Sequence, residues 1–188
     1  MRPPSNAPDR ERTFRLLYEL VYPELMRFVQ RRAHPDQAED VVADAFLVVW
    51  RRLDELPSSR GDARAWIFGI TRNILLNTHR GERRRLALGV RLADAAALAS
   101  LDDDADPIVN RVDLASAWHA LSEVHQEALG LVVFEDLKAP EAAAVLGISP
   151  VAFRLRVSRA RRALRLLLEH LPRQSRTPAA SFERTTTP

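Results

Sequence analysis

A basic segment near the carboxyl end carries the side chains best suited to bind a nucleic acid. On the side of a helix expected over residues 150–168 that faces away from its apolar stripe lie Val151, Leu155, Ser158 and Arg162, flanked by Arg154, Arg159, Arg161 and Arg165. Guanidinium groups can bond a guanine edge or phosphate oxygens, serine can bond several bases, and leucine can contact a thymine methyl. The other side repeats apolar residues at steps of four and three, which predicts a buried stripe. The pattern is typical of a helix that reads a DNA major groove, although an arginine-rich face can also be a solvated surface.

The residues before this helix predict the turn that positions it. Gly147 suits the left-handed conformation that ends a helix. Ser149 can cap the next helix with its hydroxyl, and Pro150 fits a first helical position because its missing N–H has no partner there. With a short helix starting after Leu137, the segment predicts a helix-turn-helix.

A second basic surface is expected on a helix over residues 62–80 and on the loop over residues 56–62 that precedes it. The apolar seam of this helix is formed by Ala63, Ile67, Ile70 and Ile74, and the other side carries basic and amide groups. Such a face can hold single-stranded or distorted DNA. The candidate DNA residues here are Arg60, Trp66, Arg72, Asn73 and Arg80. Trp66 and Phe68 lie off the seam, and Trp66 either packs in the core or stacks on a base.

The helix expected over residues 36–53 has a seam of its own, made by Val42, Phe46, Val49 and Leu53. Its other side exposes a row that mixes carboxylates with an apolar side chain: Asp40, Asp44, Leu47 and Arg51. This mixture is unusual for a solvated face and favours a protein partner. Trp50 either joins that row or closes the core against the first helix.

Composition restricts the function classes. The chain has 188 residues, no cysteine and five dispersed histidines, with neither a glycine-rich phosphate loop nor a nucleophile motif. We therefore expect no enzyme, metal or cofactor. The apolar runs are too short to span a bilayer and the amino terminus lacks a signal-peptide core, so we expect a cytoplasmic protein without membrane insertion.

Charge and helix propensity together predict the organisation. Basic stretches over residues 60–91 and 154–176 flank an acidic stretch over 94–113, which suggests two modules that face nucleic acid. The predicted fold is all-α, with two small helical domains joined by a flexible acidic linker, the second a helix-turn-helix domain. The expected order is a disordered amino terminus (1–10), a first module (11–85), the linker (86–110), a second module (111–171) and a disordered tail (172–188).

Three segments resemble signatures of the extracytoplasmic-function (ECF) group of RNA polymerase sigma factors, within the sigma-70 family. Residues 38–51, AEDVVADAFLVVWR, resemble the AED-x-x-x-x-x-F-x-x-x-W signature of that group, and residues 64–73, RAWIFGITRN, resemble its W-L-x-x-I-A-R-N helix. Residues 137–161 are similar to its helix-turn-helix segment. The match covers most of residues 11–170 in the order of the family.

The resemblance implies partners and roles. The 36–53 helix would dock on the β′ clamp of core RNA polymerase, and the second module would also contact the β flap. The 56–62 loop and the helix after it, notably Asn73, would capture the melted −10 promoter element. Arg154, Leu155, Arg156, Ser158 and Arg159 would read the −35 element. An anti-sigma factor is an expected partner, and the acidic linker would extend toward the RNA exit path.

The sequence departs from the family pattern at the start of the helix-turn-helix. Lys138 replaces a usual serine, so the first helix is expected to lose its hydroxyl cap, and Leu155 replaces a small polar residue on the reading face. The alternative function is a stand-alone helix-turn-helix regulator of transcription. That alternative would explain the second module and leave the first without a role.

Overall fold

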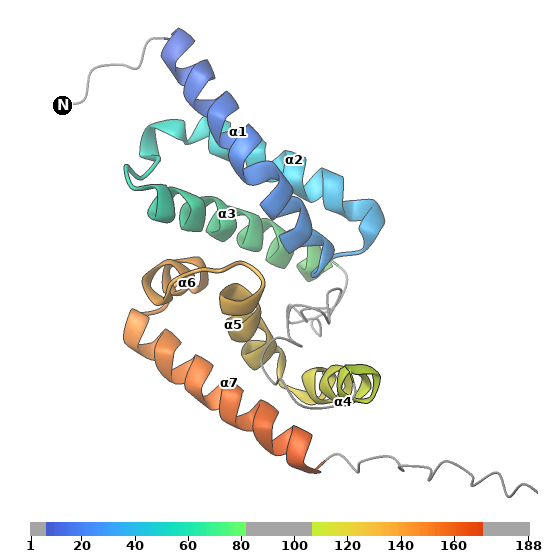
Figure 1. Cartoon of the computed structure of the whole chain (residues 1–188). Coiled ribbons are helices and arrows are strands. Elements are labelled where there is room, and N and C mark those ends of the chain that lie inside the picture. Colours follow the sequence, from blue (N-terminus) through green and yellow to red (C-terminus); the bar gives the residue numbers. More distant parts are fainter. Residues whose placement is uncertain (1–6, 82–106, 171–188) are drawn as a thin grey trace, which may run out of the picture.

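The computed structural model describes residues 7–81 and 107–170, which form helices and connecting turns with no strand in those two ranges. The amino-terminal part contains α1 (Ala7–Gln30), α2 (Pro35–Arg51), the 3-10 helix η1 (Leu53–Glu55) and α3 (Arg60–Gly81). The carboxyl-terminal part contains α4 (Pro107–Ala120), α5 (Glu123–Val133), α6 (Ala139–Leu146) and α7 (Pro150–His170). The all-α prediction is confirmed (Figure 1). The predicted linker lies outside the described residues except at its end, where Pro107 begins a helix, and the predicted tail lies wholly outside them.

The first module consists of α1, α2 and α3, which pack against one another around an apolar core. The predicted seam of α2 is confirmed, because Val42, Phe46, Val49 and Leu53 are all buried. An aromatic group joins α1 to α2, with the Phe14 ring edge-on to Phe46 and Trp50 at centroid distances of 6.0 and 5.2 Å. Trp50 therefore packs against α1 and stays partly exposed at the same time.

Two predictions for the first module are wrong. Residues 7–10 are helical, although disorder was expected there; the Arg10 guanidinium holds this turn, because it bonds both Asp54 carboxylate oxygens at 2.7 Å and the Trp50 carbonyl at 2.6 Å. Phe68 was expected off the apolar seam, but its side chain is fully buried and its ring meets Phe28 edge-on at 4.9 Å. The buried side of α3 is therefore wider than the spacing of its apolar residues predicted.

The second module places α7 across α4, α5 and α6. The predicted turn is confirmed: Gly147 has φ +66°, and the Ser149 Oγ accepts a hydrogen bond from the Ala152 N–H at 3.1 Å. The start of α6 keeps part of its cap despite Lys138, because the Glu141 carboxylate accepts the Lys138 N–H at 2.8 Å. Val124 on α5 is 48% exposed, whereas the Gln126 side chain is buried and donates to the Trp118 and Leu121 carbonyls.

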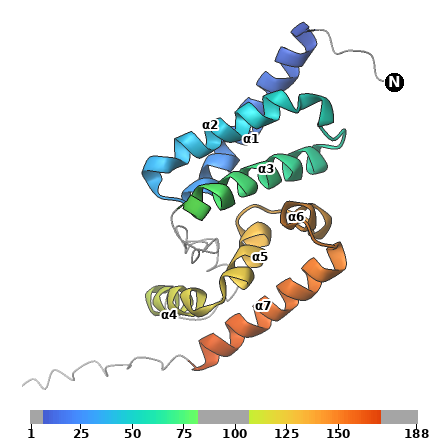
Figure 2. The same cartoon turned by 180° about the vertical axis from the view of Figure 1, so that it is seen from behind.

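The two modules lie against each other, with α6 packed on α3. Figures 1 and 2 show α6 and α5 between α3 and α7 from both sides. A Cβ atom on Gly69 would lie 3.8 Å from the Val145 Cα, so the two helices approach closely at this point. We refer to this packing as the closed arrangement. Across residues 7–81 and 107–170, no helix combines the length and apolarity needed to cross a bilayer.

Candidate nucleic-acid and partner surfaces

The α7 helix is held by its apolar stripe and leaves its basic side exposed. Phe153, Val157 and Ala160 are buried. Of the five predicted reading residues, Arg154, Leu155, Ser158 and Arg159 are exposed and Arg156 is half-buried. Leu155 is 51% exposed, which places an apolar side chain on a surface otherwise rich in donors. The predicted arrangement of this face is therefore present.

A basic groove runs beside this face. Its lining combines apolar residues from α5 to α7 with five cationic side chains: Lys138, Arg154, Arg161, Arg162 and Arg165. Cationic groups in such a position can bind phosphate oxygens without reading sequence, and they would fix a helix in register on a duplex.

The predicted row on α2 is also on the surface. Asp40, Asp44, Leu47 and Arg51 are all exposed and follow one side of the helix at steps of four, three and four. Leu47 is 52% exposed. Among the residues that the structure describes, the helix packs against α1 and α3 and has no extensive packing with the second module. The row therefore stays accessible in the closed arrangement.

The start of α3 borders a cavity of about 240 Å³ between α1 and the loop over residues 56–60. The lining mixes leucine side chains with polar and charged groups: Leu17, Leu20, Glu24, Leu56, Ser59 and Arg60. Ser59 holds the loop to the helix, because its Oγ accepts the Asp62 N–H at 3.1 Å. Arg60 and Asn73 are exposed. Trp66 is half-buried beneath the Arg52 guanidinium, whose carbon lies 5.8 Å from the ring centroid.

Arg72, a predicted DNA residue, has a partner in the other module. Its guanidinium donates to both carboxylate oxygens of Glu127 on α5, at 2.6 and 3.2 Å. The Arg72 side chain keeps 19% of its surface accessible and the Glu127 side chain 9%. In the closed arrangement the Arg72 guanidinium therefore bonds a carboxylate, whereas the sequence predicts that it contacts a nucleic acid. The side chain of Arg80 lies outside the described residues.

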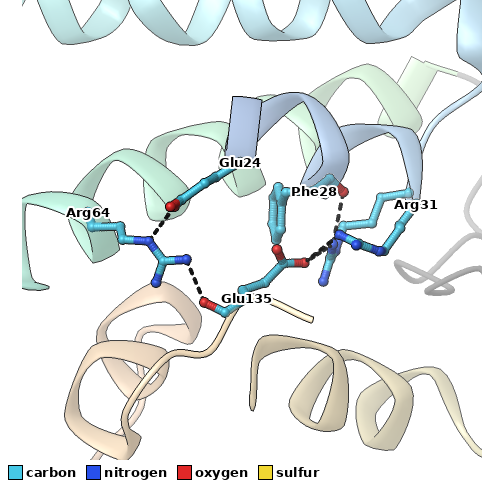
Figure 3. A network of polar contacts seen from close by, with 6 residues as sticks. Glu24, Phe28, Arg31, Arg64 and Glu135 are labelled. Atoms are coloured by element: carbon cyan, nitrogen blue, oxygen red, sulfur yellow. Dashed lines mark hydrogen bonds and ion pairs between the residues drawn. The ribbon is translucent and has the colours of Figure 1, made fainter. Parts of the chain in front are cut away.

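Glu135, in the turn after α5, contacts three arginines of the first module. Its Oε1 lies 3.2 Å from the Arg32 Nη1 and 3.5 Å from the Arg31 Nη1. Its backbone carbonyl accepts a hydrogen bond from Arg64, and Arg64 also donates to Glu24 of α1. Figure 3 shows Glu135 between the guanidinium of Arg64 and that of Arg31.

This junction buries charge that is only partly compensated. Burial raises the pKa of the Glu135 carboxyl, and the nearby Arg32 and Arg31 charges oppose that shift. Burial also lowers the pKa of Arg32 to about 10, against the attraction of Glu135 and Glu127. The Arg32 Nε and Nη2 have no hydrogen-bond partner. At neutral pH Arg32 keeps its charge, so the closed arrangement holds a cation that has lost most of its hydration.

Five residues of the junction were not predicted from the sequence as functional residues: Glu127, Glu135, Arg31, Arg32 and Arg64. A signal exists for Glu127, since it lies one turn before the buried Leu131 on the same side of α5; Glu135 lies in the turn after α5, where helical spacing does not apply. Arg31 and Arg32 directly follow the end of α1, where basic residues ordinarily complement the helix dipole, so their pattern resembles a solvated helix end.

Two known families match the chain, one for each module. The sigma-70 region 2 family matches residues 17–85, and the sigma-70 region 4 family matches residues 111–164. The RNA polymerase sigma factor CnrH of Cupriavidus metallidurans is 33% identical over 140 residues, which cover 70% of this chain and 73% of CnrH. The ECF RNA polymerase sigma factor SigL of Mycobacterium tuberculosis is 29% identical over 158 residues, which cover 84% of this chain and 89% of SigL.

Solved structures of similar fold support the same assignment. The sigma factor RpoE of Bartonella quintana, solved with the anti-sigma factor NepR, aligns with a TM-score of 0.58 and 26% identity, covering 85% of this chain and 98% of RpoE. CnrH, solved with the cytosolic domain of CnrY, aligns with a TM-score of 0.57 and 28% identity, covering 85% and 89%. One chain therefore carries the region 2 module followed by the region 4 module, together with the exposed α2 row and the exposed basic side of α7. The chain belongs to the extracytoplasmic-function group of the sigma-70 family of RNA polymerase sigma factors.

Proposed function

We propose that this chain binds core RNA polymerase through α2 and directs initiation at promoters that it recognises through α3 and α7. The observation that carries the proposal is that one chain exposes a mixed acidic and apolar row on one module and an arginine-rich reading helix on the other. The proposed activity consists of binding and positioning without a catalytic residue. Because core polymerase is its partner, the proposed site of action is the cytoplasm.

The polymerase contact is assigned to the row Asp40, Asp44, Leu47 and Arg51. Its charges can set the orientation of the partner, and Leu47 supplies the apolar surface that a docking contact buries. The expected partner surface is the β′ clamp, with a second contact between the region 4 module and the β flap.

The −10 contact is assigned to the start of α3 and to the cavity beside the 56–60 loop. An unstacked base can enter a cavity lined by leucines and closed by polar groups, where it is recognised by its edge. Arg60 lines this cavity, Asn73 stands exposed further along α3, and Trp66, Arg72 and Arg80 complete the proposed set.

The −35 contact is assigned to Arg154, Leu155, Arg156, Ser158 and Arg159 on α7. The exposed side chains among them can face base edges in a major groove, and the cations of the neighbouring groove can hold the phosphates. Leu155 favours a thymine methyl at its position of the −35 element.

Replacement of Asn73 by alanine is expected to impair promoter opening more than polymerase binding. Asn73 is exposed and holds no core contact, so its amide is available to a base, and the loss of one base contact costs about 1–3 kcal/mol. Permanganate footprinting of the melted region and a polymerase-binding assay measure the two effects separately. Equal loss of both would remove Asn73 from the −10 site.

Replacement of Arg159 by alanine is expected to weaken −35 recognition by about 1–3 kcal/mol and to relax specificity at one base pair. The measurement is initiation from a set of promoters substituted singly across the −35 element. A uniform loss across all substitutions would instead assign Arg159 to the phosphate backbone.

An anti-sigma factor is the proposed regulator. The basis is similarity to RpoE and CnrH, which were solved with NepR and with the cytosolic domain of CnrY. In this chain, the exposed α2 row and the exposed side of α7 are the surfaces that such a partner would have to cover to prevent initiation.

Multi-round transcription of fragmented genomic DNA with purified core polymerase, with and without this chain, tests the proposal. New start sites that share two spaced upstream elements would support it and would give the recognition sequence. If no new starts occur and the chain binds DNA tightly alone, it acts as a helix-turn-helix regulator instead.

A further inference from the structure

We infer that Val151 and Leu155, on the reading side of α7, form an apolar pair that recognises the C5-methyl groups of two thymines in the −35 element. The pair adds Val151 to the residues assigned to the −35 contact and predicts which base pairs they meet. The inference rests on the proposed function, because it concerns how the reading helix selects its DNA sequence.

Two large apolar side chains are exposed at the start of α7. Val151 is 67% exposed and Leu155 is 51% exposed, whereas Phe153 between them is 1% exposed. A spacing of four residues places Val151 and Leu155 on the same side of the helix, with their Cβ atoms about 5–6 Å apart. They therefore form one continuous apolar surface, turned away from the core that Phe153 joins.

The charge around the apolar pair favours DNA as its partner. Arg154 and Arg162 are exposed on either side of the pair along the reading side of α7. No acidic residue occurs in the sequence between Glu141 and Glu169, so every charged residue near the pair is basic. An apolar surface within such a basic field can approach a duplex, because the guanidinium groups hold the phosphates while the apolar atoms face the bases.

The apolar pair lies in the part of the helix that would enter a major groove. α7 begins at Pro150, so Val151 is its second residue and Leu155 lies one turn later. In helix-turn-helix proteins the first turns of the recognition helix contact base edges. The thymine methyl is the apolar group that a base pair presents in the major groove. The pair can therefore meet methyl groups, while the exposed Ser158, one turn further on, meets a polar base edge.

The separation of the two side chains limits the spacing of the two thymines. Four residues of helix rise about 6 Å, and successive base pairs are about 3.4 Å apart. The two methyl groups should therefore lie on base pairs that are one or two steps apart, on either strand. We expect the −35 element to contain two such thymines beside the position that Ser158 contacts.

Leu166 offers a comparison within the same helix. It is 45% exposed, so its exposure is close to that of Leu155. At about 1.5 Å per residue, it lies roughly 22 Å from Val151 along the helix axis, whereas the major groove is about 12 Å wide. Because the start of the helix enters the groove, Leu166 lies outside it and should contact no base.

Replacement of thymine by deoxyuridine tests the inference, because it removes the methyl group and keeps the base pairing. The promoter is one whose −35 element the transcription experiment has defined, and it is bound by this chain together with core polymerase. Each thymine of the element is replaced in turn, and affinity is measured by competition at a fixed salt concentration. We expect about a four-fold loss at each of two positions, the effect of one buried group of methyl size, and little change at other thymines.

Two alanine variants assign the methyl contacts to single residues. Val151→Ala should bind thymine and deoxyuridine equally at one of the two positions and keep the parent's preference at the other, and Leu155→Ala should show the reverse. Leu166→Ala is the matched control and should keep the preference for thymine at both positions. All three side chains are exposed, so each variant should fold as the parent does.

The inference would be overturned by a −35 element that lacks two thymines at this spacing, or by equal affinity of the parent for thymine and deoxyuridine throughout the element. An unchanged preference for thymine in both Val151→Ala and Leu155→Ala would also overturn it. If these two variants instead lost affinity for core polymerase and kept the preference, the pair would be a protein contact. If the parent chain supports no initiation with core polymerase, the proposed function fails and the inference fails with it.

Discussion

Replacement of Leu47 by aspartate is expected to reduce initiation by about 30-fold or more, by preventing stable assembly with core polymerase. Leu47 is the apolar member of the α2 row and is 52% exposed. A charge in the desolvated centre of a docking contact costs at least about 2 kcal/mol, the threshold of an interface hot spot, which corresponds to that factor. Affinity for core polymerase, measured by fluorescence anisotropy, and multi-round transcription should fall together.

The matched control is Leu16→Asp on α1. Leu16 is 59% exposed, so the same charge enters a leucine position of similar exposure outside the row. In urea unfolding, the free energy of unfolding of each variant should stay within about 0.5 kcal/mol of that of the parent, because neither side chain lies in the core. Equal loss of polymerase binding in both variants would show that α2 is not the specific docking surface.

The turn into α7 could be predicted from sequence because its determinants are local. A left-handed glycine, a serine cap and a proline at the first helical position each act within a few residues. The structure confirms Gly147 in that conformation and Ser149 as the cap. The α2 seam was predictable for a similar reason, since one side of a single helix forms it.

Side chains whose surroundings depend on other helices were harder to predict. Phe68 lies off the seam of α3 by spacing, yet it is buried because α1 brings Phe28 against it. Val124 fits the pattern of α5 and is nevertheless exposed. Helical periodicity reports one buried side, whereas α3 is covered both by its own module and by α6.

The junction between modules was the least predictable feature. Arg72 and Glu127 are 55 residues apart and Arg31 and Glu135 are 104 apart, so no local rule pairs them. The charge of Arg72 and its place in α3 predict a contact with DNA, and the structure shows the same donor bound to a carboxylate. The predicted DNA contact and the observed ion pair are compatible, because the Arg72 guanidinium can exchange the Glu127 carboxylate for a DNA phosphate.

Replacement of Arg32 by methionine is expected to stabilise the folded protein by at least about 1 kcal/mol, although it removes an ion pair. Methionine can keep the packing that Arg32 makes over the Phe28 ring, 3.7 Å from its centroid. The change removes a buried cation and leaves Arg31 with Glu135 as a balanced pair. Apolar replacement of a whole buried ion pair or triad is neutral or stabilising by about 1–4 kcal/mol, whereas removal of one partner destabilises when it leaves a buried charge unpaired. Here Arg31 stays paired with Glu135, and we expect the lower end of the range because the Phe28 carbonyl loses the bond from Arg32.

Urea unfolding of the parent and of Arg32→Met measures this difference, with Arg52→Met as the control. Arg52 is an exposed arginine in a surface pair, so its replacement should change stability by no more than about 0.5 kcal/mol. A stability loss in Arg32→Met would show that the bonds to Phe28 and Glu135 outweigh the cost of dehydrating the guanidinium.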